Sequence, residues 1–460
     1  MRSRPVSNGT SSGGAGSQAS GSIGLVTSVA FAVGTMIGGG VFVLSGLAVR
    51  RAGPSAIVSF LLAGALVLLS ALSFAVVASR AVPGGSGYAY VGRALGRYWG
   101  FMTSWSFYLS GIVLTAFVLH AFGAYFHDFF WAGASPVLPA VAAAAFLTLL
   151  NLGPASLIGR AETVLVAVKV AVLLLLIAFA LAHLDRARFT PFTPHGAGPM
   201  VATSGLLFIA FLGFNVVTNL AGDVKDPRRT VPLAIMISLF IVAVLYCGVV
   251  VALLAGQVRT YDEASVGTAA GHLMGAWGRV LIPIGALVST LSAGNANILG
   301  SSEIMVRLAA ERDVPTIAGR LWRGHPYVSV LAGAAAYLAL IVGGHTELMA
   351  ALANVAAIVA MVLVNAAAIR AMGDPAHTGL RLPLGPVLPA LGLLTALAQL
   401  AFIGWAEALA GLTLVFAGSI VYGLKTRHHP GHHQVITEHL SRNAGPVGRA
   451  LRRQGSGPSQ

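Results

Sequence analysis

Long apolar runs alternate with short polar connectors along most of this 460-residue chain. There are about twelve such runs, each of roughly 17 to 27 residues, which is the length of helix that crosses ~30 Å of hydrocarbon. They cover about 22–48, 54–80, 98–123, 136–153, 162–183, 201–221, 231–256, 277–301, 328–344, 348–370, 387–405 and 408–424. Because a helix satisfies its own backbone in lipid, the pattern predicts an all-α integral membrane protein with twelve transmembrane helices.

Composition and charge agree with a membrane setting. Hydrophobic residues make up 56% of the chain and charged residues 9%, against about 25% charged in soluble proteins. If both termini are cytoplasmic, 21 of the 28 Lys and Arg residues lie on the inner side, six lie outside, and Lys169 lies within a span. This asymmetry predicts a multi-pass protein of the cytoplasmic membrane with both termini inside. The formal charge of +14 then serves inner-leaflet contact rather than nucleic-acid binding. Arg50 and Arg51 are a local exception on the outer side.

The domain boundaries follow from composition. A Ser/Gly-rich stretch predicts a disordered cytoplasmic N-terminus over 1–21, followed by one transmembrane domain over 22–424 and a basic cytoplasmic tail over 425–460. The four tail histidines are read as solvated, with metal binding as the alternative; they are His428, His429, His432 and His433. Cys247 stands alone in an apolar run, so no disulfide framework is expected. No metal or other cofactor is predicted.

The run from Gly34 to Phe42 places four glycines where a spanning helix should avoid them. Each glycine costs roughly 1 kcal/mol in a helix interior relative to alanine, and unwound backbone at this depth is tolerated only where it lines a cavity. A second interruption, Phe211 to Asn215, falls in the sixth segment. Five segments separate the two, and an odd number of helices per unit inverts the second copy. Paired broken helices in inverted halves indicate a transport site at the bilayer midplane. The alternative is two unrelated glycine kinks that serve helix packing.

Four motifs carry a family resemblance. They are Gly34 to Phe42, Pro83 to Tyr90, Phe211 to Gly213 with Phe214 and the run Asp223 to Pro232, and Arg307 to Pro315. In this order they resemble the amino acid–polyamine–organocation superfamily, within it the cationic amino acid transporter-like permeases and their bacterial proton-coupled relatives. The resemblance implies a LeuT-like 5+5 inverted repeat, with helices 1 and 6 broken and two further helices at the C-terminal end.

The resemblance also implies a substrate site for an α-amino acid. Backbone amides of Gly38, Gly39 and Gly40 would hold its carboxylate at a helix N-terminus. The ammonium, which only donates, would be held by carbonyls; those implied are Met36, Ile209, Ala210 and Leu212. Phe211 would lie over the substrate as an aromatic gate, or would simply pack in the protein. Gly39 stands where relatives often carry Ser or Thr, so the backbone donors remain and a hydroxyl is lost. Asn215 stands where relatives commonly carry an acidic residue, which favours a neutral substrate over a cationic one.

Lys169 is the ionisable residue within a predicted span, about two helical turns past Glu162. Such a residue is a functional hypothesis by default, although a lysine near a helix end can also extend its head to the interface. In proton-coupled relatives a lysine in helix 5 occupies the place of the sodium ion, which implies a contact with carbonyls near Gly34 and a role in proton coupling. Sodium remains the rival, because Ser289, Thr290 and Ser292 offer hydroxyl ligands.

The sequence therefore predicts a secondary active transporter that moves an amino acid across the membrane by alternating access, with proton symport as the coupling. The alternatives are an ion-independent amino acid or polyamine exchanger and a transport-inactive amino acid sensor. No Ser-His-Asp, Cys-His or phosphate-loop pattern appears, so an enzyme is not expected.

Overall fold

The structure, a computed structural model, describes residues 23–79, 89–133, 135–152, 158–215, 217, 224–322, 325–373 and 380–426. The predicted N-terminal segment 1–21, the motif residues Pro83 to Tyr88 and the tail beyond Thr426 lie outside the described residues. Regular structure in the described part is helical, with isolated β-bridges at Ile23–Val224 and Trp322–His325.

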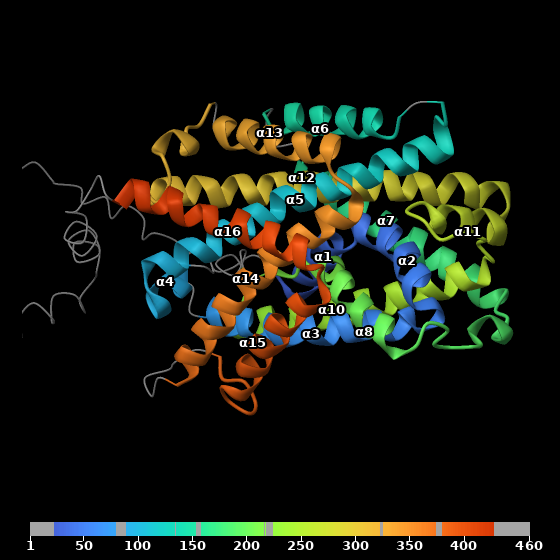
Figure 1. The fold of residues 1–460 in the computed structure, drawn as a ribbon, viewed down its shortest axis with the longest axis horizontal. Coiled ribbons are helices and arrows are strands. Elements are labelled where there is room, and N and C mark those ends of the chain that lie inside the picture. The colour runs from blue at the N-terminus through green and yellow to red at the C-terminus, as the bar shows by residue number, and fades with distance from the viewer. Residues whose placement is uncertain are drawn as a thin grey trace, which may run out of the picture.

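Each of the twelve predicted segments contains helix (Figure 1). The α-helices of the first half are α1 (Leu25–Met36), α2 (Gly39–Ala52), α3 (Ala56–Ala78), α4 (Ala89–Leu95), α5 (Arg97–Phe130), α6 (Val137–Asn151) and α7 (Ile158–Ala182). Those of the second half are α8 (Ala197–Leu207), α10 (Pro227–Ala255), α11 (Ser265–Met274), α12 (Ala276–Ala310), α13 (Tyr327–Gly343), α14 (Thr346–Met372), α15 (Val387–Gln399) and α16 (Trp405–Thr426). Short 3₁₀ helices are η1 (Gly53–Ser55), η3 (Arg186–Phe189), η4 (Phe208–Phe211), η5 (Thr316–Gly319) and η6 (Leu400–Phe402).

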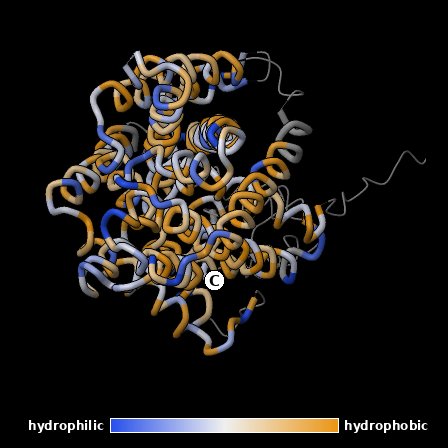
Figure 2. Tube along the Cα trace, turned by 90° about the vertical axis from the view of Figure 1, so that its right-hand side faces the viewer, coloured by the Kyte–Doolittle hydropathy of each residue, from blue (hydrophilic) through white to orange (hydrophobic). Residues whose placement is uncertain are grey.

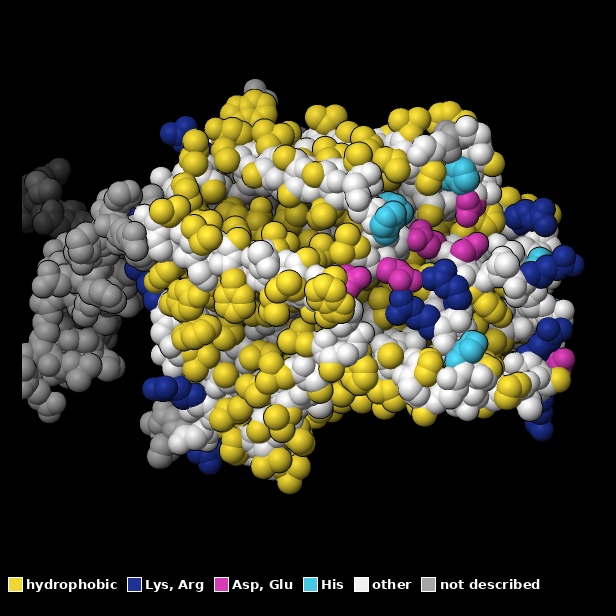
Figure 3. Space-filling view, viewed as in Figure 1, with side chains coloured by type: hydrophobic (Ala, Val, Ile, Leu, Met, Phe, Trp, Pro, Cys, Tyr) yellow, Lys and Arg dark blue, Asp and Glu magenta, His cyan; other side chains and the backbone are white. Residues whose placement is uncertain are grey.

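Seven helical stretches of the described part are long and apolar enough to cross a membrane, and five shorter helices of 10–17 residues are also apolar. Figure 2 shows hydrophobic residues on helices throughout the bundle, its periphery included. On the face drawn in Figure 3, hydrophobic side chains dominate the left and middle part, and acidic, His and Lys or Arg side chains gather from the middle toward the right-hand end, with further Lys or Arg at the left edge. The multi-pass, all-helical part of the prediction is confirmed, and the number of spans stays a prediction.

Two long helices, α5 and α12, pack against each other through the middle of the bundle. Helices α6 and α13 pack together on one side of this pair, and α14 packs against α5 on another. Helices α3, α10, α8 and α15 complete the other side (Figure 1). Glycine sets some boundaries: Gly275, with φ +69°, separates α11 from α12, a conformation that other residues rarely adopt.

The bundle has two distinct ends. At one, called here the α11 end, α2, α5 and α10 finish beside α11 and the start of α14. At the other, the α4 end, Arg97 at the start of α5 meets Asp313 just past α12. The Lys225 amide there donates to the Ile23 carbonyl at 2.9 Å. The first segment therefore runs from the α4 end to the α11 end, and the sixth runs the opposite way.

Candidate substrate and coupling site

The first helical break lies at Ile37 and Gly38, between α1 and α2. The Gly38 amide donates to the Met36 carbonyl at 2.9 Å, so the backbone turns instead of continuing as an α-helix. A Cβ on Gly38 would lie 2.7 Å from the Cβ of Ala293, and glycine is what allows α12 to approach this closely. The first amides of α2 then have no acceptor within their own helix and form a positive helix terminus.

The second break follows α8, which tightens into η4 at Phe208–Phe211. Leu212 is extended, with φ −66° and ψ 143°, and its amide donates to the Ile209 carbonyl at 3.1 Å. Gly213 has φ +123°, which a residue with a Cβ adopts only with strain. Regular helix is thus absent over Leu212 to Phe214, and a matched pair of broken transmembrane helices stays a prediction.

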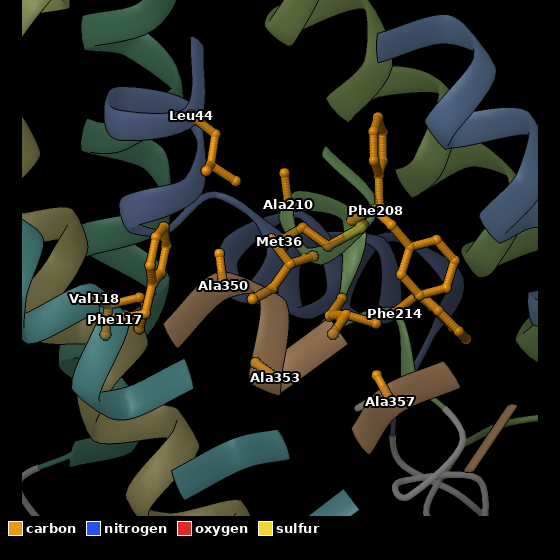
Figure 4. Close-up of a cluster of buried hydrophobic side chains, with 14 of the residues drawn as sticks. Met36, Leu44, Phe117, Val118, Phe208, Ala210, Phe214, Ala350, Ala353 and Ala357 are labelled. Carbon is orange, nitrogen blue, oxygen red and sulfur yellow. The ribbon is translucent and has the colours of Figure 1, made fainter. Parts of the chain in front are cut away.

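The structure brings the two breaks into contact. A Cβ on Gly40 would lie 3.2 Å from the Cα of Ala210, and one on Gly213 would lie 3.0 Å from the amide nitrogen of Met36. In Figure 4, Met36 and Ala210 lie next to each other where the two interrupted segments meet. All the residues predicted to bind substrate are buried here; they are Met36, Gly38, Gly39, Gly40, Ile209, Ala210, Phe211 and Leu212.

Tyr246 of α10 joins the two breaks and was missed in the sequence analysis. Its hydroxyl is 2.8 Å from the Met36 carbonyl oxygen and 2.8 Å from that of Ala210. A phenol has one proton, so the two carbonyls share a single donor. The available signal was a tyrosine inside an apolar helix, because a buried phenol requires a hydrogen-bond partner. The partner could not be identified without the fold.

Three of the four predicted ammonium-binding carbonyls already accept hydrogen bonds. Met36 accepts from Gly38 and Tyr246, Ala210 accepts from Tyr246, and Ile209 accepts from Leu212. A carbonyl oxygen has two lone pairs. An ammonium at this place would therefore compete with Tyr246 for Met36 and would find a second acceptor position on Ala210.

Lys169 of α7 is 1% exposed and reaches the first break. Its Nζ lies 3.3 Å from the Gly34 carbonyl oxygen, 3.4 Å from that of Ile37 and 2.8 Å from Ser292 Oγ on α12. An ammonium has three protons to donate, and each of these oxygen atoms can accept one. A buried charge is costly unless it is hydrogen-bonded in this way. The side chain does not extend to an interface, so the snorkelling interpretation is wrong.

The helix α12 hydroxyls named as sodium ligands take different positions. Ser289 Oγ donates to the Ile37 carbonyl at 2.9 Å, so Ile37 accepts from both Ser289 and Lys169. Thr290 Oγ1 instead donates to the Leu287 carbonyl within its own helix at 2.9 Å. Ser289 and Ser292 therefore bond at the first break through their hydroxyls. The Thr290 hydroxyl bonds within α12, and its methyl carbon lies 3.4 Å from the place that a Cβ on Gly39 would take.

The surroundings of the breaks are apolar and partly lined by small residues. Figure 4 shows Ala350 and Ala353 of α14 on one side of Met36, and Phe117 and Val118 of α5 close by. Phe211 is fully buried, with its ring edge-on to Phe60 and Tyr246. Those contacts are packing contacts, and its position over a substrate stays a prediction. The Glu162 side chain lies outside the described residues.

Comparison with known proteins identifies the family. The family model described as amino acid permease matches residues 27–410, and this chain belongs to that family. The predicted resemblance to the amino acid–polyamine–organocation superfamily is thereby confirmed. The members of this family are permeases, which are transporters and not enzymes, as the sequence predicted.

Three named relatives are similar to this chain. The chain is 30% identical to the inner membrane transport protein YbaT of Escherichia coli over 67% of this chain and 74% of the relative. It is 28% identical to the branched-chain amino acid permease BcaP of Bacillus subtilis, over 86% and 91% respectively. It is also 26% identical to the methylthioribose transporter of Bacillus subtilis, again over 86% and 91%.

Proposed function

We propose that this protein moves a neutral amino acid across the cytoplasmic membrane together with a proton, by alternating access. The observation that carries the proposal is the position of Lys169, whose ammonium holds the broken first segment to α12 through Gly34, Ile37 and Ser292. The paired breaks supply the substrate site, and Lys169 supplies a group whose charge can change during the cycle.

The substrate site follows from the two charges of an α-amino acid. The first amides of α2, at Gly39 and Gly40, present donors and a positive helix terminus to a carboxylate. The carbonyls of Ala210 and Leu212 present acceptors to an ammonium across the contact between the breaks. As the substrate enters, its ammonium would replace the Tyr246 hydroxyl at either the Met36 or the Ala210 carbonyl. We therefore include Tyr246 among the binding residues.

The side-chain part of the site favours a neutral, apolar substrate. Leu44, Val118, Phe208 and Ala350 surround the meeting point of the breaks (Figure 4), and an apolar lining offers nothing to offset the desolvation of a second cationic group. Asn215 in place of an acidic residue acts in the same direction. The printed name of the branched-chain amino acid permease supports an aliphatic amino acid for this chain too.

The Lys169 contacts favour a proton over sodium. A sodium ion in this place would need the same oxygen atoms that the ammonium already binds, because hard cations take carbonyl and hydroxyl ligands. Desolvation favours the neutral amine and the three acceptors favour the charged form. Gain and loss of the proton would therefore tighten and release the link between α7, the first break and α12.

The helix directions support the predicted inverted repeat. Segments 1 and 6 run in opposite directions between the two ends. So do α3 and α10, and α5 and α12. With the α4 end cytoplasmic, as the arginine distribution predicts, opposite tilts of the two halves would expose the breaks to each side in turn.

Uptake into proteoliposomes tests this function directly. Purified protein should accumulate labelled neutral amino acids when the lumen is alkaline relative to the outside, without internal substrate and without sodium. Cationic amino acids should compete weakly. Uptake that requires internal substrate would instead favour the exchanger, and tight binding without flux would favour the sensor.

A further inference from the structure

Arg50 and Arg51, the two arginines that run against the predicted charge distribution, share one partner. Arg50 Nη2 lies 2.8 Å from Oε1 of Glu347, and Arg51 Nη2 lies 2.6 Å from Oε2. Each oxygen of the carboxylate thus has its own guanidinium. The three residues link the last turn of α2 to the first turn of α14, 296 or more positions away in sequence.

The dipoles of α2 and α14 stabilise the charges of these three side chains. The arginines lie at the C-terminal, negative end of α2, and Glu347 lies at the N-terminal, positive end of α14. Their side chains remain 39–51% exposed, and exposed ion pairs are individually weak. A weak contact of this kind can open and close without a large barrier.

The contact borders a hollow of about 340 Å³ at the α11 end. The hollow is walled by α2, α5, α14 and the loop before α11; its lining residues are Leu47, Arg50, Ala124, Asp128, Asp262, Glu263, His345, Thr346 and Glu347. Leu47 is 2% exposed and lies seven residues from Gly40 on the same helix, about 10 Å at 1.5 Å per residue. The hollow therefore lies over α2 on the way toward the breaks.

Further contacts hold the other walls of the hollow together. Thr346 Oγ1 is 3.1 Å from His120 Nδ1 on α5, and the same ring atom is 3.9 Å from Glu263 Oε2. Next to Glu263, the Asp262 carbonyl lies against α2, since a Cβ on Gly46 would come within 2.1 Å of it. The start of α14 is thus attached to α5 through His120. The Arg50 and Arg51 contacts are its ionic attachment to α2 in the described part of the chain.

We propose that Arg50, Arg51 and Glu347 form an outer gate, which must separate before an amino acid can pass between α2 and α14 to the breaks. This inference rests on the proposed function, which supplies the passage of an amino acid and the assignment of the α11 end to the outside. It explains why two arginines lie on the side that the charge distribution disfavours. In the arrangement described here the gate is closed.

Cysteine accessibility tests the gate, because Cys247 is the single cysteine of the chain. In a Cys247→Ala background, Leu47→Cys places a thiol under the gate. A membrane-impermeant thiol reagent is added to the outside of intact cells, and its rate of reaction is measured. With Glu347→Gln we expect this rate to rise about fivefold or more, and with a charge-reversed Arg50→Glu, Arg51→Glu, Glu347→Arg protein we expect it to return toward the starting value.

Glu407→Gln is the matched control, since Glu407 also lies in the first turn of its helix and has no ion pair within the described part of the chain. It should leave the rate unchanged. An unchanged rate in a monodisperse Glu347→Gln protein would overturn the gate. This measurement uses neither uptake nor pH, so a protein that fails to couple to protons but still responds to Glu347→Gln would refute the coupling and keep the gate.

Discussion

The Lys169 ammonium lies 2.8 Å from the Ser292 hydroxyl, which ties α7 to α12 beside the first helical break. This contact is shorter than those of the same ammonium to the Gly34 and Ile37 carbonyls, and of these three residues only Ser292 accepts through its side chain. It can therefore be removed by mutation, whereas the Gly34 and Ile37 carbonyls cannot. Hydrogen bonds to charged groups contribute about 1.5–3 kcal/mol.

Ser292→Ala should reduce proton-driven uptake by about tenfold or more, because the charged form of Lys169 loses one acceptor. The measurement is initial uptake at a fixed pH gradient in proteoliposomes. Ser302→Ala is the control: Ser302 lies on the same helix but donates to the Leu299 carbonyl within it, and its uptake should stay near that of the wild type. Equal losses in both variants would contradict a specific role for Ser292.

Tyr246→Phe removes the hydroxyl that spans the two breaks and keeps the ring packing against Phe60 and Phe211. Two buried carbonyls lose their shared donor, which should lower stability by about 1–3 kcal/mol and reduce the transport rate. Thermal unfolding and uptake kinetics measure the two effects.

Tyr337→Phe provides the matched control for this change. Its hydroxyl is also buried, but it pairs with Thr148 of α6, away from the breaks. We expect it to lower stability without changing the substrate concentration dependence of uptake. If both tyrosine variants changed the kinetics alike, Tyr246 would have no special part in the site.

Gly213→Ala should destabilise the protein by about 1–3 kcal/mol, because alanine is strained at φ +123°. The new Cβ would also press on the backbone of Met36, so amino acid binding should weaken as well. Gly300→Ala on α12 meets nothing within 4 Å and should be neutral or slightly stabilising. Substrate-induced shifts in the unfolding temperature read out both effects, and retained substrate protection in Gly213→Ala would argue against the paired site.

The Arg97–Asp313 pair at the α4 end predicts a pH dependence of stability. Burial raises the pKa of Asp313 above its ordinary value, and the Arg97 guanidinium, 2.7 Å away, opposes that rise. A raised carboxyl pKa means that the folded state binds more protons, so this group's contribution to stability falls as pH rises above about 4.

Arg97→Gln should therefore cost about 1–2 kcal/mol near pH 7.5, less than a fully buried pair because Arg97 is partly exposed. The deficit should shrink at pH 5, where more of Asp313 is protonated. Unfolding temperatures at the two pH values measure this, with the exposed Arg93→Gln as control. A deficit that is the same at both pH values would show that the charge of Asp313 is not responsible.

The sequence revealed where backbone fails to stay helical, because glycine at Gly38 and Gly213 acts through local conformation. It also identified Lys169 as exceptional, since a charge inside an apolar run is visible without a fold. Contacts between distant segments of the bundle could not be predicted from the sequence. Tyr246 bonds the two breaks and Glu347 binds Arg50 only because distant segments pack together, and periodicity does not show which segments meet. The ends of α5 and α12 beyond the predicted 98–123 and 277–301 were missed because a hydropathy pattern predicts the length that spans a membrane, whereas these helices continue to 130 and 310 through stretches that include charged residues.

Proton coupling through Lys169 is tested most directly by substrate-driven proton movement. Proteoliposomes loaded with a pH-sensitive dye, held without sodium, should acidify internally when a neutral amino acid is added outside to the wild-type protein. Lys169→Gln should bind the amino acid, as shown by its effect on the unfolding temperature, and should produce no acidification. Equal acidification in wild type and Lys169→Gln, or amino acid uptake driven by a sodium gradient alone, would contradict proton coupling through Lys169.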